Sequence, residues 1–361
     1  MTLPYKQKRN LPEPRTYTGI PTYDVGPLII NGENVKGVVE RVPLATLETT
    51  IIPSTQRGMK VIELSGGVYT SVEDRGMTRS PYLRFDNGKK AGKFCEYVKE
   101  NNRELAAAVE STTKYGKFMS ISTYRLGNIV HLRLTMNTGD ASGHNMVGKA
   151  AEYGVLGYLK EKDLGILDYC LSGNTCTDKK VSAGNMIQGR GKKVDAEIVI
   201  PRDIVREFLK TEPEKITRVI KHKNLEGSII AASIGSANAH HSNIIAAMYL
   251  ATGQDIANLV EASQGITNAE VRENGDLYFR ITSPNLIVGT LGNGKEEGEQ
   301  RKNLELLGCH GSVDPIGHNS KKLAEIIGAT VLAGELSLIA ALTVEGALTD
   351  AHERYERKKL I

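Results

Sequence analysis

The pattern of apolar and polar residues changes near Thr78 and changes back near Ser172, and this change most constrains the architecture. The stretch between them alternates short apolar strands with helical periodicity, which is typical of a compact α+β unit. The chain has 361 residues, more than the roughly 250–300 at which one hydrophobic core stops growing. We therefore predict a large domain made of two separated pieces, 1–80 and 172–361, with a small domain, 81–171, inserted between them.

Within the small domain, the periodicity predicts an alternation of helices and strands. These elements are a helix over 90–111, strands over 118–124 and 128–137, a helix over 144–159 and a strand over 164–171.

Three segments of the large domain also allow predictions. Residues 228–263 are rich in Ala, Ser, Gly and Ile, which suits a helix packed on all sides, because small side chains let neighbours approach closely. A last long helix is predicted from Ala333 to Lys358, where a charged run ends it. Residues 1–20 are polar and contain proline, which predicts an irregular lead-in.

The composition argues against several classes of protein. The net charge is only +4, and the chain has no Trp and 5% aromatic residues, so stacking platforms for single-stranded nucleic acid are scarce. Four separated cysteines form no CxxC pair, and no His cluster completes a zinc pattern. No apolar run approaches the ~18 residues of a membrane span, and no signal peptide is recognisable. We expect a cytoplasmic protein with reduced thiols and no metal, which binds neither nucleic acid nor membranes.

The first candidate for chemistry is the turn-rich loop from Ser172 to Lys180, with the sequence SGNTCTDKK. Asp178 beside Lys179 and Lys180 gives clustered charge with little apolar cover. A cationic lysine can polarise a carbonyl oxygen and stabilise negative charge that develops in a transition state. The alternative is an ordinary solvated loop.

The second candidate is the segment from Asn238 to Asp255. At helical spacing His240 and Asn243 share a face, and Asp255 follows His240 by close to four turns, which predicts that it lies near the same stripe. A carboxylate among Ala, Ile and Leu needs a partner, and a lysine from another segment would serve. A partly exposed helix with its polar groups in water is the alternative.

Two single residues and one glycine-rich stretch complete the candidates. Glu48 could act as a general acid if burial raised its pKa, and His352 is a natural proton donor near neutral pH. For both residues, an ordinary solvated side chain is the more common case. Residues 139–146 precede a predicted helix, so their backbone N–H groups could meet a phosphate. The Rossmann fingerprint is absent, so any dinucleotide site must be of another kind.

Taken together, these segments resemble the 3-hydroxy-3-methylglutaryl-CoA (HMG-CoA) reductases. The resemblance runs in order over most of the chain. Its specific pieces are GMTR at 76–79, GNTCTDKK at 173–180, QGRGK at 188–192, NAH at 238–240, GQD at 253–255, GT at 289–290 and GELSL at 334–338.

The resemblance implies an α+β fold, with a large HMG-CoA-binding domain containing a long central helix and an inserted ferredoxin-like dinucleotide-binding domain. It implies the two-step reduction of HMG-CoA to mevalonate and CoA by two NAD(P)H. Lys179 would polarise the carbonyl and Glu48 would supply a proton. Asp255 would hydrogen-bond to both of them and tune their pKa values. His352 would protonate the departing CoA thiolate.

The resemblance also implies binding residues for each ligand. Those for the HMG group are Arg79, Ser172, Asn174, Asp178, Lys180, Lys223 and Asn243. Those on the CoA side are Ser54, Arg57 and His240. Those for the dinucleotide are Thr113, Lys114, Tyr115, Asp140, Gly143, Asn145 and Met146, with Arg357 added because it and Lys114 could meet a 2′-phosphate.

Some implications stay open. The 2′-phosphate contacts favour NADPH, with NADH possible, and active sites between subunits imply an obligate homodimer or a higher homo-oligomer. Ser142 and His144 stand where the family's dinucleotide motif has methionines. Two alternatives are the oxidative degradation of mevalonate with NAD, and a catalytically silent homologue that only binds acyl-CoA.

Overall fold

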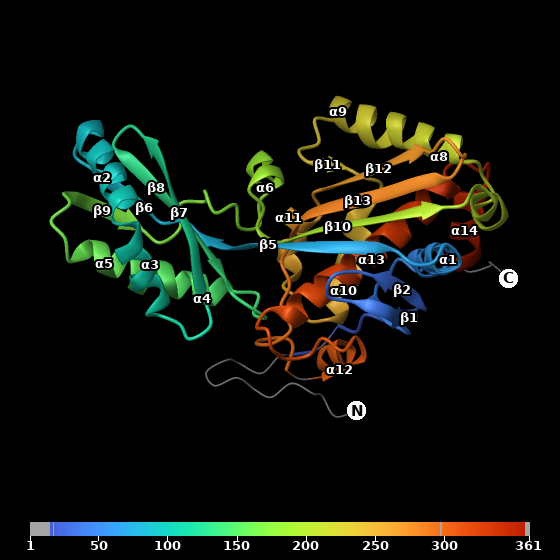
Figure 1. The fold of residues 1–361 in the computed structure, drawn as a ribbon, viewed down its shortest axis with the longest axis horizontal. Helices are drawn as coiled ribbons and strands as arrows, with labels where there is room; N and C mark the ends of the chain where they lie inside the picture. Colours follow the sequence, from blue (N-terminus) through green and yellow to red (C-terminus); the bar gives the residue numbers. More distant parts are fainter. Residues whose placement is uncertain (1–14, 17, 297, 358–361) are drawn as a thin grey trace.

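The structure is a computed structural model that describes residues 15, 16, 18–296 and 298–357. Two bodies lie side by side in it and are joined by one long central strand (Figure 1). Each body has its own hydrophobic core, and we call the bodies the large and the small domain. The predicted lead-in at residues 1–14 lies outside the described residues.

The large domain packs a sheet against helices, of which the long α13 (His318–Ala341) is the most deeply buried. The other elements of its N-terminal piece are β1 (Thr22–Val25), β2 (Leu28–Asn31), β3 (Lys36–Val39), β4 (Val42–Ala45) and α1 (Ile51–Leu64). Those of its C-terminal piece are α6 (Ala183–Ile187), β10 (Gly191–Ile200), α7 (Arg202–Ile204), η2 (Val205–Leu209), α8 (Pro213–Val219), η3 (Ile220–Gly227), α9 (Ser228–Ile230), β11 (Ser236–Ala237), α10 (His241–Ala251), η4 (Ile256–Asn258), α11 (Leu259–Ala262), β12 (Gly265–Val271), β13 (Leu277–Leu286), α12 (Gly298–Leu306) and α14 (Ala347–Tyr355).

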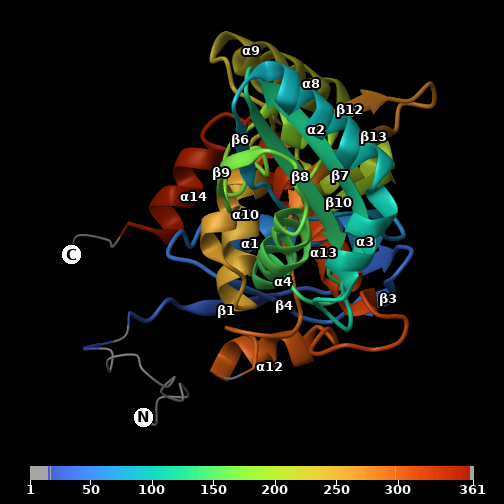
Figure 2. The same ribbon diagram turned by 90° about the vertical axis from the view of Figure 1, so that its left-hand side faces the viewer.

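The small domain has the order β-α-β-β-α-β with an antiparallel sheet, which is the ferredoxin-like arrangement (Figure 2). Its strand order is β7-β8-β6-β9, and its helices cover one face. Its elements are β6 (Tyr82–Phe85), α2 (Gly88–Glu100), α3 (Asn102–Glu110), β7 (Lys117–Leu126), β8 (Ile129–Asn137), α4 (His144–Lys149), η1 (Ala150–Leu156), α5 (Gly157–Lys160) and β9 (Ile166–Cys170).

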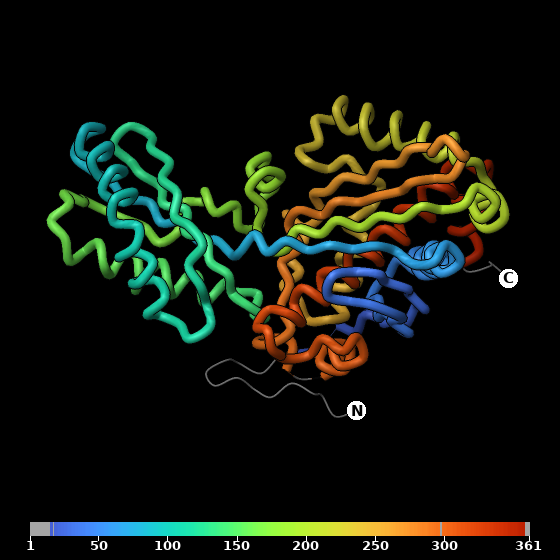
Figure 3. Tube along the Cα trace, in the orientation of Figure 1, coloured from blue at the N-terminus to red at the C-terminus, as the bar shows by residue number. Residues whose placement is uncertain are grey.

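The strand that joins the domains is β5 (Tyr69–Arg79). Its first part pairs with β10 of the large domain, and its last residues, Met77 to Arg79, pair with β8 of the small domain. The pairing with β10 is irregular near Gly76, which has a φ of 72°. The chain therefore enters the small domain without leaving the sheet, and returns through the loop that follows β9 (Figure 3).

The observed helix boundaries correct three predictions. The helix predicted over 90–111 is two helices, because the Asn101 side chain donates to the Tyr97 carbonyl and ends α2 there. The helix predicted from Ala333 begins at His318 and ends at Ala341, and Gly346, at a φ of 76°, starts the separate α14. Lys358 lies outside the described residues. Only α10 within 228–263 is the predicted closely packed helix, and the rest of that segment is broken into short elements.

Among the described residues, α13 is long and apolar enough to cross a membrane by composition alone. However, 94% of its most apolar stretch is buried inside the protein, so it is the core helix of the large domain. Its start depends on the small domain: Gly317 and Ser320 donate their backbone N–H groups to the Asp140 carboxylate. The sequence near residue 318 could not show this contact.

Candidate active site

The loop from Ser172 to Lys180 lies where the two domains meet, and it brings Lys179 to Asp255. The distance from Lys179 Nζ to Asp255 Oδ2 is 2.8 Å, and both side chains are partly exposed. Asp255 lies just beyond the end of α10, where its carboxylate also accepts the Ala257 backbone N–H. We call Asp178, Lys179 and Asp255 the Lys179 site.

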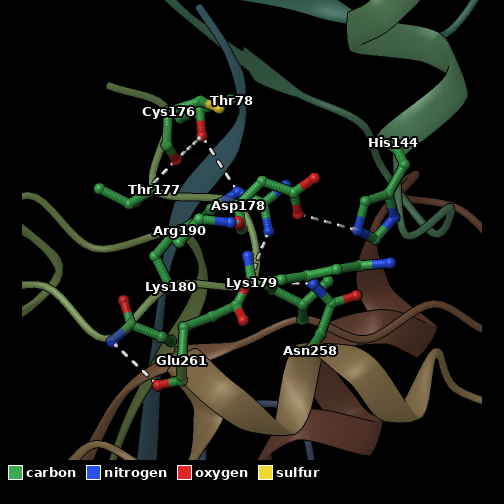
Figure 4. A network of polar contacts seen from close by, with 12 residues as sticks. Thr78, His144, Cys176, Thr177, Asp178, Lys179, Lys180, Arg190, Asn258 and Glu261 are labelled. Atoms are coloured by element: carbon green, nitrogen blue, oxygen red, sulfur yellow. Dashed lines mark hydrogen bonds and ion pairs between the residues drawn. The ribbon is translucent and has the colours of Figure 1, made fainter. Parts of the chain in front are cut away.

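Buried charges beneath the loop fix the position of Lys179. The Glu261 Oε1 atom accepts the Lys179 backbone N–H at 3.2 Å and lies 2.8 Å from Arg190 Nη1. Arg190 and Glu261 are both fully buried, and Arg190 Nη2 lies 2.9 Å from Asp178 Oδ1 (Figure 4). Lys179 has a φ of 54°, which is costly for a residue other than glycine, so these contacts are needed to hold it.

The electrostatics of the Lys179 site keep Asp255 ionised. Partial burial alone would raise the pKa of Asp255, but hydrogen bonds from Lys179 and Ala257 lower it below its ordinary value. Burial has the larger effect on Glu261, so its pKa is raised despite the Arg190 guanidinium beside it. The Lys179 ammonium therefore faces the ionised carboxylate of Asp255, and the Lys179 backbone N–H faces the buried carboxylate of Glu261.

A cavity of about 580 Å³ opens beside Asp255, and we call it the junction pocket because both domains line it. The small domain contributes the backbone turn 141–143 and the first residues of α4. The large domain contributes the turns 253–255 and 291–295. Gly143, Asn145 and Met146, three of the predicted dinucleotide residues, lie in its wall.

The other predicted dinucleotide residues are placed differently. The Asp140 carboxylate is buried and is taken up by Ser312, Gly317 and Ser320, so it faces the start of α13 rather than the junction pocket. Residues 113–115 form a turn in which Thr113 Oγ1 accepts the Tyr115 backbone N–H, and this turn reaches Met146 through the adjoining Gly116. Arg357 is exposed, and its Nη1 atom lies 3.6 Å from Glu353 Oε1.

A second cavity, of about 490 Å³, lies between α1, α14 and the start of α10. Six of its polar lining residues come from the sequence predictions, and we call these six the Glu48 site. They are Glu48, Ser54, Arg57, His240, Asn243 and His352.

Glu48 and His352 of the Glu48 site have exposed contacts, whereas Arg57 and His240 have part-buried or buried ones. Asn243 Nδ2 donates to Glu48 Oε1 at 3.2 Å, and His352 Nδ1 lies 2.8 Å from Glu356 Oε2. Arg57 donates to Ser337 on α13. The His240 backbone N–H is bound by Glu335, which is fully buried.

The two sites lie at opposite ends of α10, and this corrects the predicted stripe. His240 precedes the first turn of the helix, whereas Asp255 follows its end, so they do not share a face. An 11-residue helix is about 16 Å long at 1.5 Å per residue. Within one chain, the structure therefore brings Asp255 to Lys179 but holds Glu48 and His352 elsewhere.

The remaining predicted residues surround the Lys179 site or lie away from it. Arg79 ends β5 with its Nε atom buried, while Ser172, Asn174 and Lys180 are exposed on the loop. Lys223 is exposed on η3, between α8 and α9 at the outer edge of the large domain (Figure 1).

The sequence reasoning missed the two buried carboxylates under these sites. Glu261 lies in the short α11, and Glu335 lies in the apolar core helix α13. An acid within an apolar helix was the available indication for Glu335, because it needs partners there. Nothing in the sequence pairs Glu261 with Arg190, 71 residues away. No group of three or more His, Cys, Asp or Glu side chains suited to a metal occurs among the residues that the structure describes.

Solved structures with the same fold include 3-hydroxy-3-methylglutaryl-CoA reductases. The chain superposes with a TM-score of 0.70 on a Streptococcus pneumoniae structure described as class II 3-hydroxy-3-methylglutaryl-CoA reductase bound to NADPH in open conformations. The match covers 94% of this chain and 78% of that one at 21% identity, which supports the fold alone. The predicted fold class is confirmed.

Sequence comparisons identify the family. The sequence model of hydroxymethylglutaryl-coenzyme A reductase matches residues 7–357. The 3-hydroxy-3-methylglutaryl-coenzyme A reductase of Pyrococcus abyssi is 46% identical over 94% of this chain and 82% of its own length. The Methanocaldococcus jannaschii reductase is 42% identical over the same shares of the two chains. This chain belongs to the hydroxymethylglutaryl-coenzyme A reductase family.

Proposed function

We propose that this chain reduces HMG-CoA to mevalonate and CoA, with two NAD(P)H, in the mevalonate pathway. The observation that carries the proposal is the Lys179 ammonium, held 2.8 Å from Asp255 at the edge of the junction pocket. A fixed cation is what a carbonyl needs when it accepts hydride, because its oxygen becomes negative. Family membership supplies the substrate, and the site supplies the chemistry.

Each proposed catalytic residue has a role suited to its place. Lys179 polarises the carbonyl and stabilises the oxyanion, and Asp255 keeps the ammonium oriented. Glu48 supplies a proton as the aldehyde is reduced, and His352 protonates the departing CoA thiolate. Glu356 lies against His352, and the contact places the imidazole on the wall of the Glu48 site.

The ligand-binding roles are proposed from the resemblance to the family. Ser172, Asn174, Asp178 and Lys180 lie on the loop that carries Lys179, and we propose that they hold the HMG group. Arg79 supplies a cation suited to the terminal carboxylate of that group. Ser54, Arg57 and His240 suit the CoA side of the Glu48 site. Lys223 and Asn243 are proposed to complete the HMG pocket.

The junction pocket fits a nicotinamide dinucleotide. Gly292, at a φ of 90°, leaves open space where a side chain would stand, and the buried Lys295 adds a cation to the wall. Gly143, Asn145, Met146, the backbone of Asp140 and the turn 113–115 would hold the dinucleotide, which supplies hydride when bound. Lys114 and Arg357 are the proposed contacts to a 2′-phosphate, so we propose NADPH as the preferred form.

We further propose that two copies of the chain make each complete active site. Glu48 is bonded to Asn243 in the first turn of α10, while Asp255 follows the far end of that helix. Because the two groups lie at opposite ends of α10 within one chain, we propose that Glu48 of one copy meets Lys179 of another. We accordingly propose an obligate homodimer or higher homo-oligomer in the cytoplasm, binding neither membrane nor nucleic acid.

We propose that the boundaries between the large and the small domain fall between residues 80 and 81 and between residues 171 and 172.

The test is NAD(P)H oxidation with HMG-CoA by the wild-type chain and by Lys179→Ala. Removing one oxyanion donor typically lowers kcat by about 10²–10³, and we expect at least that loss, with an unchanged unfolding midpoint. A folded Lys179→Ala variant with normal turnover would contradict the role. Faster turnover of mevalonate with NAD and CoA would favour the oxidative alternative. CoA binding without turnover would favour the alternative of a catalytically silent homologue that only binds acyl-CoA.

A further inference from the structure

The strongest feature not used by the proposed reaction is His144, at the start of α4. Its side chain points from the small domain across to the loop that carries Lys179 (Figure 4). The Nε2 atom is buried and has no hydrogen-bond partner among the residues that the structure describes. The nearest acceptor is Asp178 Oδ1, 3.9 Å away, which is too far for a hydrogen bond.

Asp178 Oδ1 also has capacity left for a ligand. It lies 2.9 Å from Arg190 Nη2, but that ion pair is too bent to count as a hydrogen bond, and the oxygen accepts none. A carboxylate oxygen accepts more than one hydrogen bond. A buried donor and a buried acceptor therefore face each other across a gap that neither closes.

The imidazole is neutral at physiological pH. Burial lowers the pKa of His144 to about 4, and the Arg190 guanidinium adds to this, while Asp178 and Asp255 oppose it. A neutral imidazole donates one N–H and cannot form a charged pair with Asp178. Water that enters the gap would satisfy both groups only until a ligand of the right chemistry displaces it.

The group that fits between an N–H donor and a carboxylate acceptor is a hydroxyl, because it accepts through its oxygen and donates through its hydrogen. For an oxygen about 2.8 Å from both His144 Nε2 and Asp178 Oδ1, the angle between the two hydrogen bonds would be roughly a right angle. A tetrahedral hydroxyl tolerates this angle. His144 lines the junction pocket, and the side chains of His144 and Asp178 are each about one fifth exposed, so a ligand in the pocket can approach the pair.

We propose that His144 and Asp178 together recognise the 3-hydroxyl group of the acyl substrate, which makes His144 a specificity-determining residue. This rests on the proposed function, since it takes HMG-CoA as the substrate. Asp178 immediately precedes Lys179, so a hydroxyl bound here lies a short distance from the carbonyl that Lys179 polarises. The hydroxyl thereby fixes the acyl chain for hydride transfer.

The test compares HMG-CoA with 3-methylglutaryl-CoA, which lacks only the 3-hydroxyl. A site that hydrogen-bonds a substrate hydroxyl rejects the analogue strongly, because its buried polar groups are then left unpaired. We expect the wild type to prefer HMG-CoA by about 10²-fold or more in kcat/KM. His144→Met should lose at least about tenfold of that preference, with the loss falling on HMG-CoA and not on the analogue.

His144→Gln is the matched control, because its amide keeps an N–H donor and should retain part of the preference. If the analogue is not reduced at all, its inhibition constant against HMG-CoA gives the same ratio for each variant. An unchanged preference in His144→Met would overturn the proposal. So would a raised KM for NAD(P)H with the preference intact, which would assign His144 to the cofactor. A wild type that does not oxidise NAD(P)H with HMG-CoA would instead contradict the proposed function.

Discussion

The Lys179 site and the Glu48 site differ in how their groups are held. At the Lys179 site, the loop is fastened by Arg190 and Glu261, whose side chains are fully buried. At the Glu48 site, the acid and His352 stand on exposed segments, and their partners Asn243 and Glu356 are themselves partly exposed. The backbone of the first site is thus held by buried charges, whereas Glu48 and His352 of the second have only exposed side-chain contacts.

The buried carboxylates beneath the two sites show the same contrast in another form. Glu261 is partnered by an arginine, yet burial still raises its pKa. Glu335 is fully buried, but the neighbouring His240 and His241 and its hydrogen bonds, including those from Thr267 and Ala239, outweigh burial and lower its pKa. The difference teaches that the partners of Glu261 do not offset the cost of its burial, whereas those of Glu335 do.

The largest expected effect comes from combining defects in the two sites. Lys179→Ala and Glu48→Gln should each reduce turnover at least about 10²-fold. When the two variants are co-expressed, random pairing makes half of the dimers mixed, and each mixed dimer has one intact site if the sites are shared. Turnover should therefore recover to about a quarter of the wild-type value. Recovery absent from isolated mixed dimers would show that each chain builds its own site.

The next effect concerns stability under the Lys179 loop. Arg190→Met leaves Glu261 buried without its cation, which should cost about 3–5 kcal/mol in the free energy of unfolding. Urea unfolding monitored by circular dichroism gives this value. The double variant Arg190→Met/Glu261→Leu is the matched control and should recover much of the loss. Equal destabilisation in both variants would mean that the charge pair is not the cause.

A smaller effect should appear in the pH dependence of stability. The pKa of His144 is about 4 when folded and about 6.5 when unfolded, so the unfolded chain binds this proton first. Stability linked to His144 is therefore full above pH 6.5 and is lost as the pH falls towards 4, by about 2 kcal/mol at pH 5. Comparing urea unfolding at pH 8 and pH 5 should show this slope in the wild type and a shallower one in His144→Met. The same pH dependence of stability in the wild type and in His144→Met would contradict a lowered pKa of His144 as its cause.

The smallest effect is expected at the Glu48 site. The pKa of Glu356 is lowered chiefly by its hydrogen bond with His352, but both side chains are partly exposed. Exposed pairs contribute little to stability, so Glu356→Gln should leave the urea midpoint unchanged at pH 7. A shift as large as that of Arg190→Met would remove the contrast between the two sites.

The sequence predicted much of this fold but not the arrangement of its site residues. The small-domain strands were predictable because each is a short local pattern, and both strands over 117–137 appear as expected. The pairing of a lysine with Asp255 was also predictable, since an isolated carboxylate needs a partner. The start of α13 was not, because it is capped by Asp140 from the other domain. The separation of His240 from Asp255 was missed because α10 stops at Ala251.

The strand β5 has a mechanical consequence for how ligands enter the junction pocket. Because one strand carries hydrogen bonds to both domains, neither can swivel freely on a linker. Opening must bend or twist a shared sheet, and the irregular pairing beside Gly76 is where such a deformation meets least resistance. We therefore expect any displacement of the small-domain wall of the pocket to be coupled to bending of β5.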